Sequence, residues 1–183
     1  RALSAWQNAL AGRAWNALYL ENHDHARVIS RYGSERYRSE SGKALAAAYM
    51  LLQGTPFIYQ GQEIGMTNLR LPSADMYPDV MTQGNVKLAS RWLSPKRVLR
   101  LTQDTARDSA HTPMQWTGGE NGGFTEGTPW IGVNKNAERI NAESELQDPD
   151  SIFHYYQKLI RLRKEYDVIA YGDITPVDQG NPS

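Results

Sequence analysis

The chain has 183 residues, enough for one ordinary domain, and its 20 basic and 20 acidic side chains cancel to a formal net charge of zero. The neutral charge and the lack of any apolar run near the ~20 residues of a membrane-spanning helix indicate neither a nucleic-acid partner nor a membrane partner. The absence of cysteine excludes disulfides and thiolate metal sites, and it suits a reducing, cytoplasmic environment.

The first third of the chain has the pattern of a strand–helix–strand unit. Its predicted elements are, in order, a helix over 3–11, a strand over 14–20, a polar loop over 21–33, a helix over 39–53 and a strand over 56–61. Pro56 stands first in the second strand, where its missing N–H is tolerated. Strands joined through a helix normally lie parallel in one sheet that helices cover, so we expect an α/β architecture.

The rest of the chain alternates helices with long irregular segments. In order, we predict an irregular segment over 62–78, helices over 79–93 and 95–105, an irregular segment over 106–149, a helix over 151–165 and a strand over 168–177. Pro95 fits the first turn of its helix, because that turn needs no N–H donor. The sequence does not begin with Met and stops soon after the last predicted strand, so we expect a piece of a longer polypeptide.

Polar residues follow both strands of the predicted unit. Residues 21–27 are ENHDHAR, and residues 60–68 are QGQEIGMTN. In parallel α/β sheets and barrels, ligands bind at the carboxyl ends of the strands. We therefore expect the two polar clusters to lie together at one edge of the sheet, formed by the carboxyl ends of both strands and called the rim.

Three interpretations of Asn22-His23-Asp24 are open from the residues alone. The first is a turn, which Asn and Asp favour. The second is a metal site built on His23 and His25, although no third ligand stands at a recognised spacing. The third is a sugar site, in which a carboxylate beside an imidazole binds vicinal hydroxyls and stabilises the positive charge of a glycosyl transition state.

Two other features also have alternative interpretations. Glu63 is either buried and paired near the rim or a cap of the turn between Gly61 and Gly65, and in both cases we favour a structural role. The aromatic residues of the long irregular segment either pack in the interior or form a platform on which the apolar faces of sugar rings stack: Trp116, Phe124 and Trp130.

Three long motifs occur in order along the chain. They are LENHDHARVISRYG from Leu20, GTPFIYQGQEIGMTN from Gly54 and HTPMQWTGGENGGFTEGTPWIGVN from His111. Together they closely resemble the α-glucosidase and oligo-1,6-glucosidase branch of the α-amylase family of glycoside hydrolases, whose sucrose-isomerase and trehalose-forming relatives share these features. The resemblance spans residues 15–171, nearly the whole chain.

The resemblance implies a (β/α)8 TIM barrel followed by a β-sandwich domain. By this resemblance, 14–20 and 56–60 are the seventh and eighth barrel strands, and 62–149 is the insertion that covers the active-site mouth. Residues 1–168 are then expected to be the carboxyl-terminal part of the catalytic barrel. Residues 169–183 are expected to be the truncated start of the carboxyl-terminal β domain.

The resemblance also implies hydrolysis of α-glucosidic bonds of short oligosaccharides or disaccharides with retention. The family's Asp nucleophile and Glu acid/base follow earlier strands and have no match here, so we expect the chain alone to be inactive. Asp24 matches the third carboxylate, which stabilises the transition state and binds hydroxyls of the −1 glucose. His23 matches the neighbour that binds the same hydroxyls. No metal and no cofactor is expected for these residues.

The chain departs from the family pattern at several positions. His25-Ala26 stands where Gln-Pro is usual, and Gln62 stands where Glu is usual. His111 replaces an Arg that often reaches the −1 glucose, and an imidazole is shorter and has fewer donors than a guanidinium. Arg107, four residues earlier, is a candidate substitute. His111 and Arg107 are therefore both predicted to bind substrate.

Alternatives to a hydrolase stay open. The parent protein is otherwise a sucrose isomerase or transglucosidase, or a non-catalytic barrel domain of the same family, although the retained Asn22-His23-Asp24 favours an active parent. The open strand edges and apolar faces of a partial barrel also predict self-association of the chain.

Overall fold

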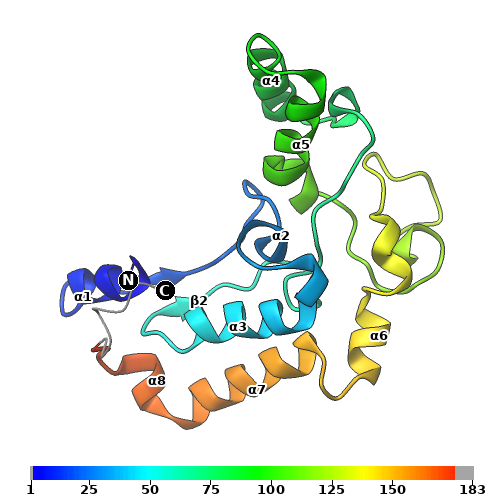
Figure 1. Ribbon diagram of the computed structural model, residues 1–183. Helices are drawn as coiled ribbons and strands as arrows, with labels where there is room; N and C mark the ends of the chain where they lie inside the picture. Colours follow the sequence, from blue (N-terminus) through cyan, green and yellow to red (C-terminus); the bar gives the residue numbers. More distant parts are fainter. Residues whose placement is uncertain (1, 176–183) are drawn as a thin grey trace.

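The computed structural model describes residues 2–175, apart from the side chain of Ala2. Figure 1 shows the helices α1 (Ala2–Leu10), α2 (Val28–Tyr32), α3 (Arg38–Met50), α4 (Val80–Ala89), α5 (Pro95–Thr105), α6 (Ala142–Gln147), α7 (Ile152–Glu165) and α8 (Asp167–Tyr171). The strands are β1 (Ala17–Leu18) and β2 (Thr55–Pro56). Short 3-10 helices lie at Glu35–Tyr37, Ala74–Met76, Arg107–Ala110, Glu120–Gly123 and Lys135–Glu138. Within residues 2–175, no helix is both long enough and apolar enough to cross a membrane.

β1 and β2 form a parallel pair, as the strand–helix–strand pattern predicts. Ala17 pairs with Thr55 and Leu18 with Pro56, and the Phe57 N–H donates to the Leu18 carbonyl at 2.7 Å. The pair is shorter than predicted because each strand has one neighbour in the described part of the chain. β2 also begins one residue earlier than predicted, so Pro56 is its second residue.

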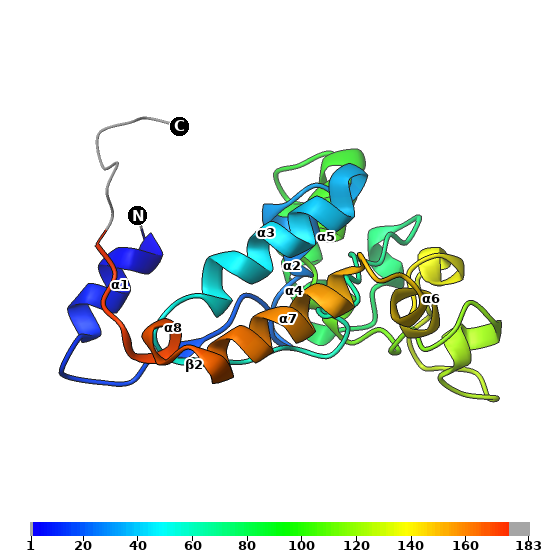
Figure 2. The ribbon, with the colours of Figure 1, turned by 90° about the horizontal axis from the view of Figure 1, so that it is seen from below.

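The main core lies where α3 and α7 run side by side next to the strand pair (Figures 1 and 2). Its members come from β1, α2, the α3 region and α7: Leu18, Val28, Ile29, Ala46, Tyr49, Met50, Leu52, Ile152, Tyr156 and Leu159. Burial of one large apolar side chain is worth about 1.5–3 kcal/mol, so this cluster is the main stabilising element of the described chain.

Arg163 of α7 fixes the end of α3. Its guanidinium donates to the carbonyl oxygens of Met50 at 2.5 Å, Leu52 at 2.6 Å and Gly54 at 2.6 Å. Carbonyls at a helix end lack intrahelical partners, and this contact satisfies them. Gly54 then enters β2 with a φ of +132°, where an added Cβ would lie 2.5 Å from the Asn16 carbonyl oxygen.

α4 and α5 form a hairpin that stands away from the α3–α7 core (Figure 1). The Asp79 carboxylate caps α4 by accepting the N–H groups of Met81 and Thr82 at 3.0 Å each. Pro95 opens α5, as predicted. The hairpin joins the rest of the molecule through a contact of α5 with α2, close to the predicted rim.

Two short α-helices, α2 and α6, lie in segments that were expected to be irregular. Residues 28–32, expected in a polar loop, form α2, because Val28 and Ile29 are buried in the main core. Residues 142–147, expected to be irregular, form α6, whose cap Asn141 accepts the Ser144 N–H at 2.8 Å. Tertiary burial and a local cap, rather than periodicity, therefore produce these helices.

The strand predicted over 168–177 is wrong where it can be compared with the structure. Residues 168–171 lie in α8, which ends where the Gly172 N–H donates to the Val168 carbonyl at 2.9 Å. Residues 172–175 form no strand, since no described strand lies beside them to pair with. The remaining residues of the predicted β domain, 176–183, lie outside the described residues.

Candidate functional site

The two polar clusters that follow β1 and β2 lie together, as predicted. The backbone N–H of Arg27 donates to the Asn68 side-chain oxygen at 2.8 Å, and its guanidinium donates to the Gln60 carbonyl at 2.6 Å. The guanidinium also lies over the Tyr59 ring, 5.5 Å from its centroid. The carboxyl ends of the two strands therefore share one rim.

Arg27 holds this rim from inside. Its side chain is fully buried and pairs with the Glu21 carboxylate at 3.0 Å, which also accepts the Val28 N–H at 2.6 Å. Arg27 Nε donates to the Ser109 carbonyl at 3.1 Å and so connects the rim to the later segment. Burial raises the pKa of Glu21, while Arg27 and the Val28 N–H act in the opposite direction. Arg27 thus braces the loop that follows β1.

Asp24 lies at the surface of the rim. Its backbone N–H donates to the Asn22 side-chain oxygen at 2.9 Å, which is the local bond of an Asx turn. One carboxylate oxygen accepts from Arg107 at 2.9 Å, and the other lies 3.3 Å from His23 Nε2. The Asp24 side chain is 49% exposed and that of His23 is 68% exposed. The turn therefore holds the Asp24 carboxylate between an imidazole and a guanidinium. Part of this carboxylate stays exposed, where a ligand can contact it.

Arg107 joins Asp24 to the start of the α4–α5 hairpin. Its second terminal nitrogen lies 2.8 Å from the Asp79 carboxylate. This hydrogen bond lowers the pKa of Asp79 to about 2, and the two carboxylates raise the pKa of Arg107. Asp79, which sequence reasoning did not propose, is therefore part of the site. Its position just before a helix predicts a helix cap, but no local sequence pattern predicts its contact with Arg107.

Asp108, which was also not predicted from the sequence, is a buried residue that holds Asp79 and the start of α4 in place. Its side chain is buried, accepts the Asp79 N–H at 2.9 Å and accepts the Thr82 hydroxyl at 2.5 Å. The short helix that contains Arg107 is thus bonded directly to the first turn of α4.

His111 lines a different pocket from Asp24 and Arg107. Asp24 and Arg107 line a pocket of about 200 Å³ between the rim and the α4–α5 hairpin. His111 lines a more open pocket of about 610 Å³ together with Tyr59, Gln60, Phe124 and Trp130. The rings of His111 and Trp130 lie 6.5 Å apart. No hydrogen bond or ion pair of the described residues joins His111 to Asp24.

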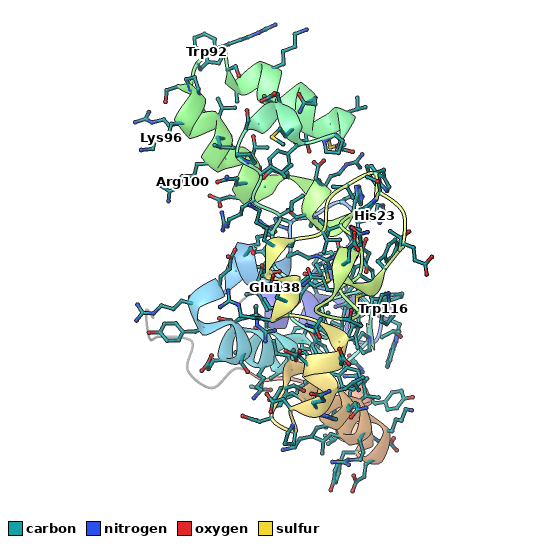
Figure 3. All side chains as sticks on the ribbon, turned by 90° about the vertical axis from the view of Figure 1, so that its right-hand side faces the viewer. His23, Trp92, Lys96, Arg100, Trp116 and Glu138 are labelled. Carbon is teal, nitrogen blue, oxygen red and sulfur yellow. The ribbon has the colours of Figure 1, made fainter. Side chains whose placement is uncertain are left out.

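The aromatic residues of the long segment are exposed rather than packed. More than half of the surface of Trp116, Phe124 and Trp130 is accessible. Phe124 and Trp130 line the pocket of His111, whereas Trp116 does not. In the view of Figure 3, Trp116 lies on the same side of the molecule as His23. Exposure of these rings supports the platform interpretation over internal packing.

Gln62 and Glu63 lie in the loop after β2, largely removed from the surface. Gln62 is buried, and its amide donates to the hydroxyls of Tyr49 at 3.2 Å and Tyr156 at 2.8 Å, which links α3 to α7. Burial raises the pKa of Tyr49 to about 12. Burial also raises the pKa of Glu63, and the backbone N–H groups of Glu63 and Gly61 partly oppose this rise. Glu63 is thus half-buried at the Gly61 turn.

The metal interpretation of the rim gains no geometric support. Across residues 2–175, there is no group of three His, Cys, Asp or Glu side chains arranged so that it could hold a metal ion. His23 instead contacts Asp24.

Curated relatives are glycoside hydrolases. The chain is 48% identical to the oligo-1,6-glucosidase of Parageobacillus thermoglucosidasius over 185 residues, an alignment that covers 100% of this chain and 33% of the relative. It is 44% identical to the trehalose-6-phosphate hydrolase of Bacillus subtilis (strain 168), with 99% of this chain and 33% of the relative covered.

The chain also matches solved structures and a family model. Bacillus licheniformis trehalose-6-phosphate hydrolase (TreA) matches with a TM-score of 0.89 and 47% identity over 94% of this chain and 32% of that chain. Isomaltulose synthase from Erwinia rhapontici NX5 matches with a TM-score of 0.90 and 36% identity over 96% and 32%. The chain thus spans about a third of the length of its relatives and shares their TIM-barrel fold family. Residues 1–172 match the family model "Alpha amylase, catalytic domain", so the chain belongs to the α-amylase catalytic-domain family.

Proposed function

We propose that this chain is part of a retaining glycoside hydrolase that cleaves α-glucosidic bonds of short oligosaccharides or disaccharides. The names of its relatives, oligo-1,6-glucosidase and trehalose-6-phosphate hydrolase, support the reaction class. The observation that carries the proposal is the surface carboxylate of Asp24, held at the strand rim between Arg107 and His23. The cytoplasmic location expected from sequence stays a prediction.

We also propose where the chain sits in the catalytic domain. β1 and β2 are taken as the seventh and eighth barrel strands, which their parallel pairing supports. Residues 62–149, which include the α4–α5 hairpin, are taken as the cover of the active-site mouth. Residues 169–183 are taken as the start of a carboxyl-terminal β domain.

In this proposal Asp24 stabilises the transition state. An oxocarbenium-like sugar ring gains positive charge, and a fixed carboxylate that also binds ring hydroxyls interacts with it more strongly than with the ground state. His23, next to the exposed edge of Asp24, donates to the same hydroxyls. By comparison with other preorganised electrostatic groups, loss of this carboxylate should raise the barrier by roughly 3–4 kcal/mol.

The other two predicted substrate-binding residues have separate places in this scheme. Arg107 acts beside Asp24, in the smaller pocket. His111 acts in the larger aromatic pocket, where Trp130 and Phe124 offer faces for a sugar ring.

The nucleophile and the general acid are assigned to residues outside this chain. Retaining hydrolysis needs a pair of carboxyl groups on either side of the scissile bond, and Asp24 fills neither role. We therefore expect the purified 183-residue chain not to hydrolyse p-nitrophenyl α-glucoside. Turnover by the chain, in a preparation free of host glucosidase, would contradict this assignment.

Activity is expected in the longer polypeptide that we propose contains this chain. There, Asp24→Asn should lower kcat for p-nitrophenyl α-glucoside by about 100-fold or more. Asp75→Asn makes the same charge change at an exposed residue outside both pockets and serves as the control. Equal activity of the two variants would contradict the role of Asp24.

A sucrose isomerase is the second candidate function. The structural match to isomaltulose synthase favours it, with a TM-score of 0.90. Incubation of the longer polypeptide with sucrose separates the two activities, because a hydrolase releases glucose and fructose whereas an isomerase returns an isomeric disaccharide. A polypeptide that is inactive on both sucrose and p-nitrophenyl α-glucoside would instead support a non-catalytic barrel domain.

A further inference from the structure

One guanidinium links two carboxylates across the gap between the rim and the hairpin. Arg107 Nη1 lies 2.9 Å from Asp24 Oδ1, and Nη2 lies 2.8 Å from Asp79 Oδ2. The guanidinium is planar and rigid, so a fixed bond at one nitrogen sets the direction in which the other nitrogen donates.

The Asp79 end of this link is the rigid end. Oδ1 accepts the N–H groups of Met81 and Thr82, and the Asp79 N–H donates to the buried Asp108 carboxylate. These bonds leave Oδ2 for Arg107. The Asp79 side chain is only 11% exposed.

The Asp24 end is the less constrained end. Asp24 lies in a surface turn, its side chain is 49% exposed, and within the described residues Arg107 is the only arginine or lysine that contacts its carboxylate. The orientation of the Asp24 carboxylate therefore depends on Arg107, which is held in turn by Asp79 at the start of the hairpin.

We propose that Asp79 is a positioning residue for Asp24 and acts through Arg107, so that the cap of α4 also fixes the transition-state carboxylate. This inference rests on the proposed function. Because the pKa of Asp79 is lowered to about 2, Asp79 stays ionised from weakly acidic to alkaline pH. The contact between Asp79 and Arg107 therefore keeps both of its charges near neutral pH.

Asp79→Asn separates this role from helix capping. Asn caps helices about as well as Asp, so α4 should keep its N-terminus. When the Asn oxygen accepts the Met81 and Thr82 N–H groups, its NH₂ group faces Arg107, a donor, and the charge-assisted bond is lost. Asp75→Asn is the matched control, since Asp75 is exposed on the same segment and bonds to the Ser73 hydroxyl rather than to Arg107.

The first measurement needs no activity. In the 183-residue chain labelled with ¹³C at the Asp carboxyl carbons, Asp79→Asn should shift the Asp24 signal, and Asp75→Asn should leave it in place. In an Arg107→Ala background, Asp79→Asn should no longer shift the Asp24 signal. An Asp24 signal that does not move in Asp79→Asn, or that moves equally without Arg107, overturns the proposal.

The second measurement uses the longer polypeptide. Asp79→Asn should lower kcat about tenfold or more, with KM changed far less, because a misplaced catalytic group slows the chemical step. The same substitution should cost nothing further in the Arg107→Ala background. An equal loss in both backgrounds would show that Asp79 acts through the fold of α4 and would overturn the proposal. If the wild-type polypeptide shows no activity, the proposed function fails, while the carboxyl signals still decide whether Asp79 positions Asp24.

Discussion

Glu63 has a carboxyl group that burial makes costly to ionise. Its Oε2 atom is buried and has no hydrogen-bond partner in the described chain, and burial raises its pKa above the ordinary 4.5. A carboxyl with a higher pKa in the folded state contributes stability below about pH 4.5, which is lost as the pH rises through the folded pKa. We therefore expect Glu63→Gln to raise the free energy of unfolding at pH 7 relative to wild type, with little difference at pH 4, in urea titrations of the chain.

An exposed glutamate is the control for this prediction. Glu126 lies on the surface of the long loop, and Glu126→Gln should leave the difference in stability between pH 4 and pH 7 unchanged. A loss of stability in Glu63→Gln at pH 7 would mean that the ionised carboxylate has a favourable partner, and the prediction would be wrong.

The Glu21–Arg27 pair gives a second prediction, of opposite sign. Both side chains are almost fully buried, and removal of one charge leaves the other buried without compensation. Arg27→Met should lower the free energy of unfolding by about 3–5 kcal/mol, measured by urea denaturation at pH 7, because it removes the cation that offsets the burial of the Glu21 carboxylate. Asp150→Asn breaks the pair with Lys43 at a carboxylate that is 94% exposed, and it should cost under about 1 kcal/mol. Similar losses in the two variants would contradict the prediction.

Sequence predicted site residues inside a motif or, for Arg107, a few residues away from one. Asp24 and His23 belong to one short motif, and the structure places them in contact. The contact of Arg107 with Asp24 joins residues 83 positions apart, and Asp79 enters only because it shares that guanidinium. Such contacts depend on how the hairpin packs on the rim, which no local pattern contains. The proximity of Arg107 to Asp24 fits its predicted role, which stays a prediction, as does that of His111.

At the scale of elements, the packing of α3 on α7 depends on Gly42. A Cβ at this position would lie 2.6 Å from Ile152 Cδ1 and 3.4 Å from Ile29 Cδ1, and both isoleucines are buried. Alanine normally favours a helix interior by about 1 kcal/mol over glycine, but overpacking costs about 1–3 kcal/mol. We expect Gly42→Ala to lower the free energy of unfolding by about 1 kcal/mol in urea titrations.

Two further variants test the cause of that loss. Gly84 of α4 has no atom within 4 Å of an added Cβ, so Gly84→Ala should stabilise the chain by about 1 kcal/mol. Ile152→Val removes Cδ1 and should cost less in the Gly42→Ala background than alone. Additive effects of the two substitutions would show that the close approach to Ile152 is not the cause.

The elements were predictable in proportion to their length and periodicity. α5 and α7 have apolar faces that repeat over several turns, and α3 is rich in alanine, a strong helix former; all three lie close to where the sequence predicts them. α2 has five residues, too few for a periodic pattern, and it forms because Val28 and Ile29 enter the core. Residues 168–171 are apolar enough for a strand, but they form a helix because no neighbouring strand is present in the described chain.

At the scale of the whole molecule, the family and the TIM-barrel fold family were predicted from three motifs and are confirmed by the comparisons. The place of the chain within a barrel stays a prediction. The structure adds that the outer edges of the two-stranded sheet are open, with no further strand beside them in the described chain. β1 and β2 pair only with each other in the described chain, while the relatives that match it are about three times as long.

Large aromatic side chains lie exposed beside this open sheet. Trp15 and Tyr19, on either side of β1, are each 50% exposed, and Phe57, just after β2, is 56% exposed. Unpaired strand edges and contiguous apolar surface favour association with another chain. The structure therefore offers a second copy both backbone groups to pair with and apolar area to bury.

We accordingly expect the chain to self-associate through this region. Light scattering should give a mass above the 20.6 kDa of one chain that increases with concentration. Tyr19→Lys with Phe57→Lys should reduce the mass towards that of a monomer, because charged side chains at a sheet edge oppose pairing. Trp92→Lys is the control, since Trp92 is 85% exposed but lies on the α4–α5 hairpin, away from the strands (Figures 1 and 3). A wild-type chain that is a monodisperse monomer, or an association lost equally in Trp92→Lys, would contradict an interface at the strand pair.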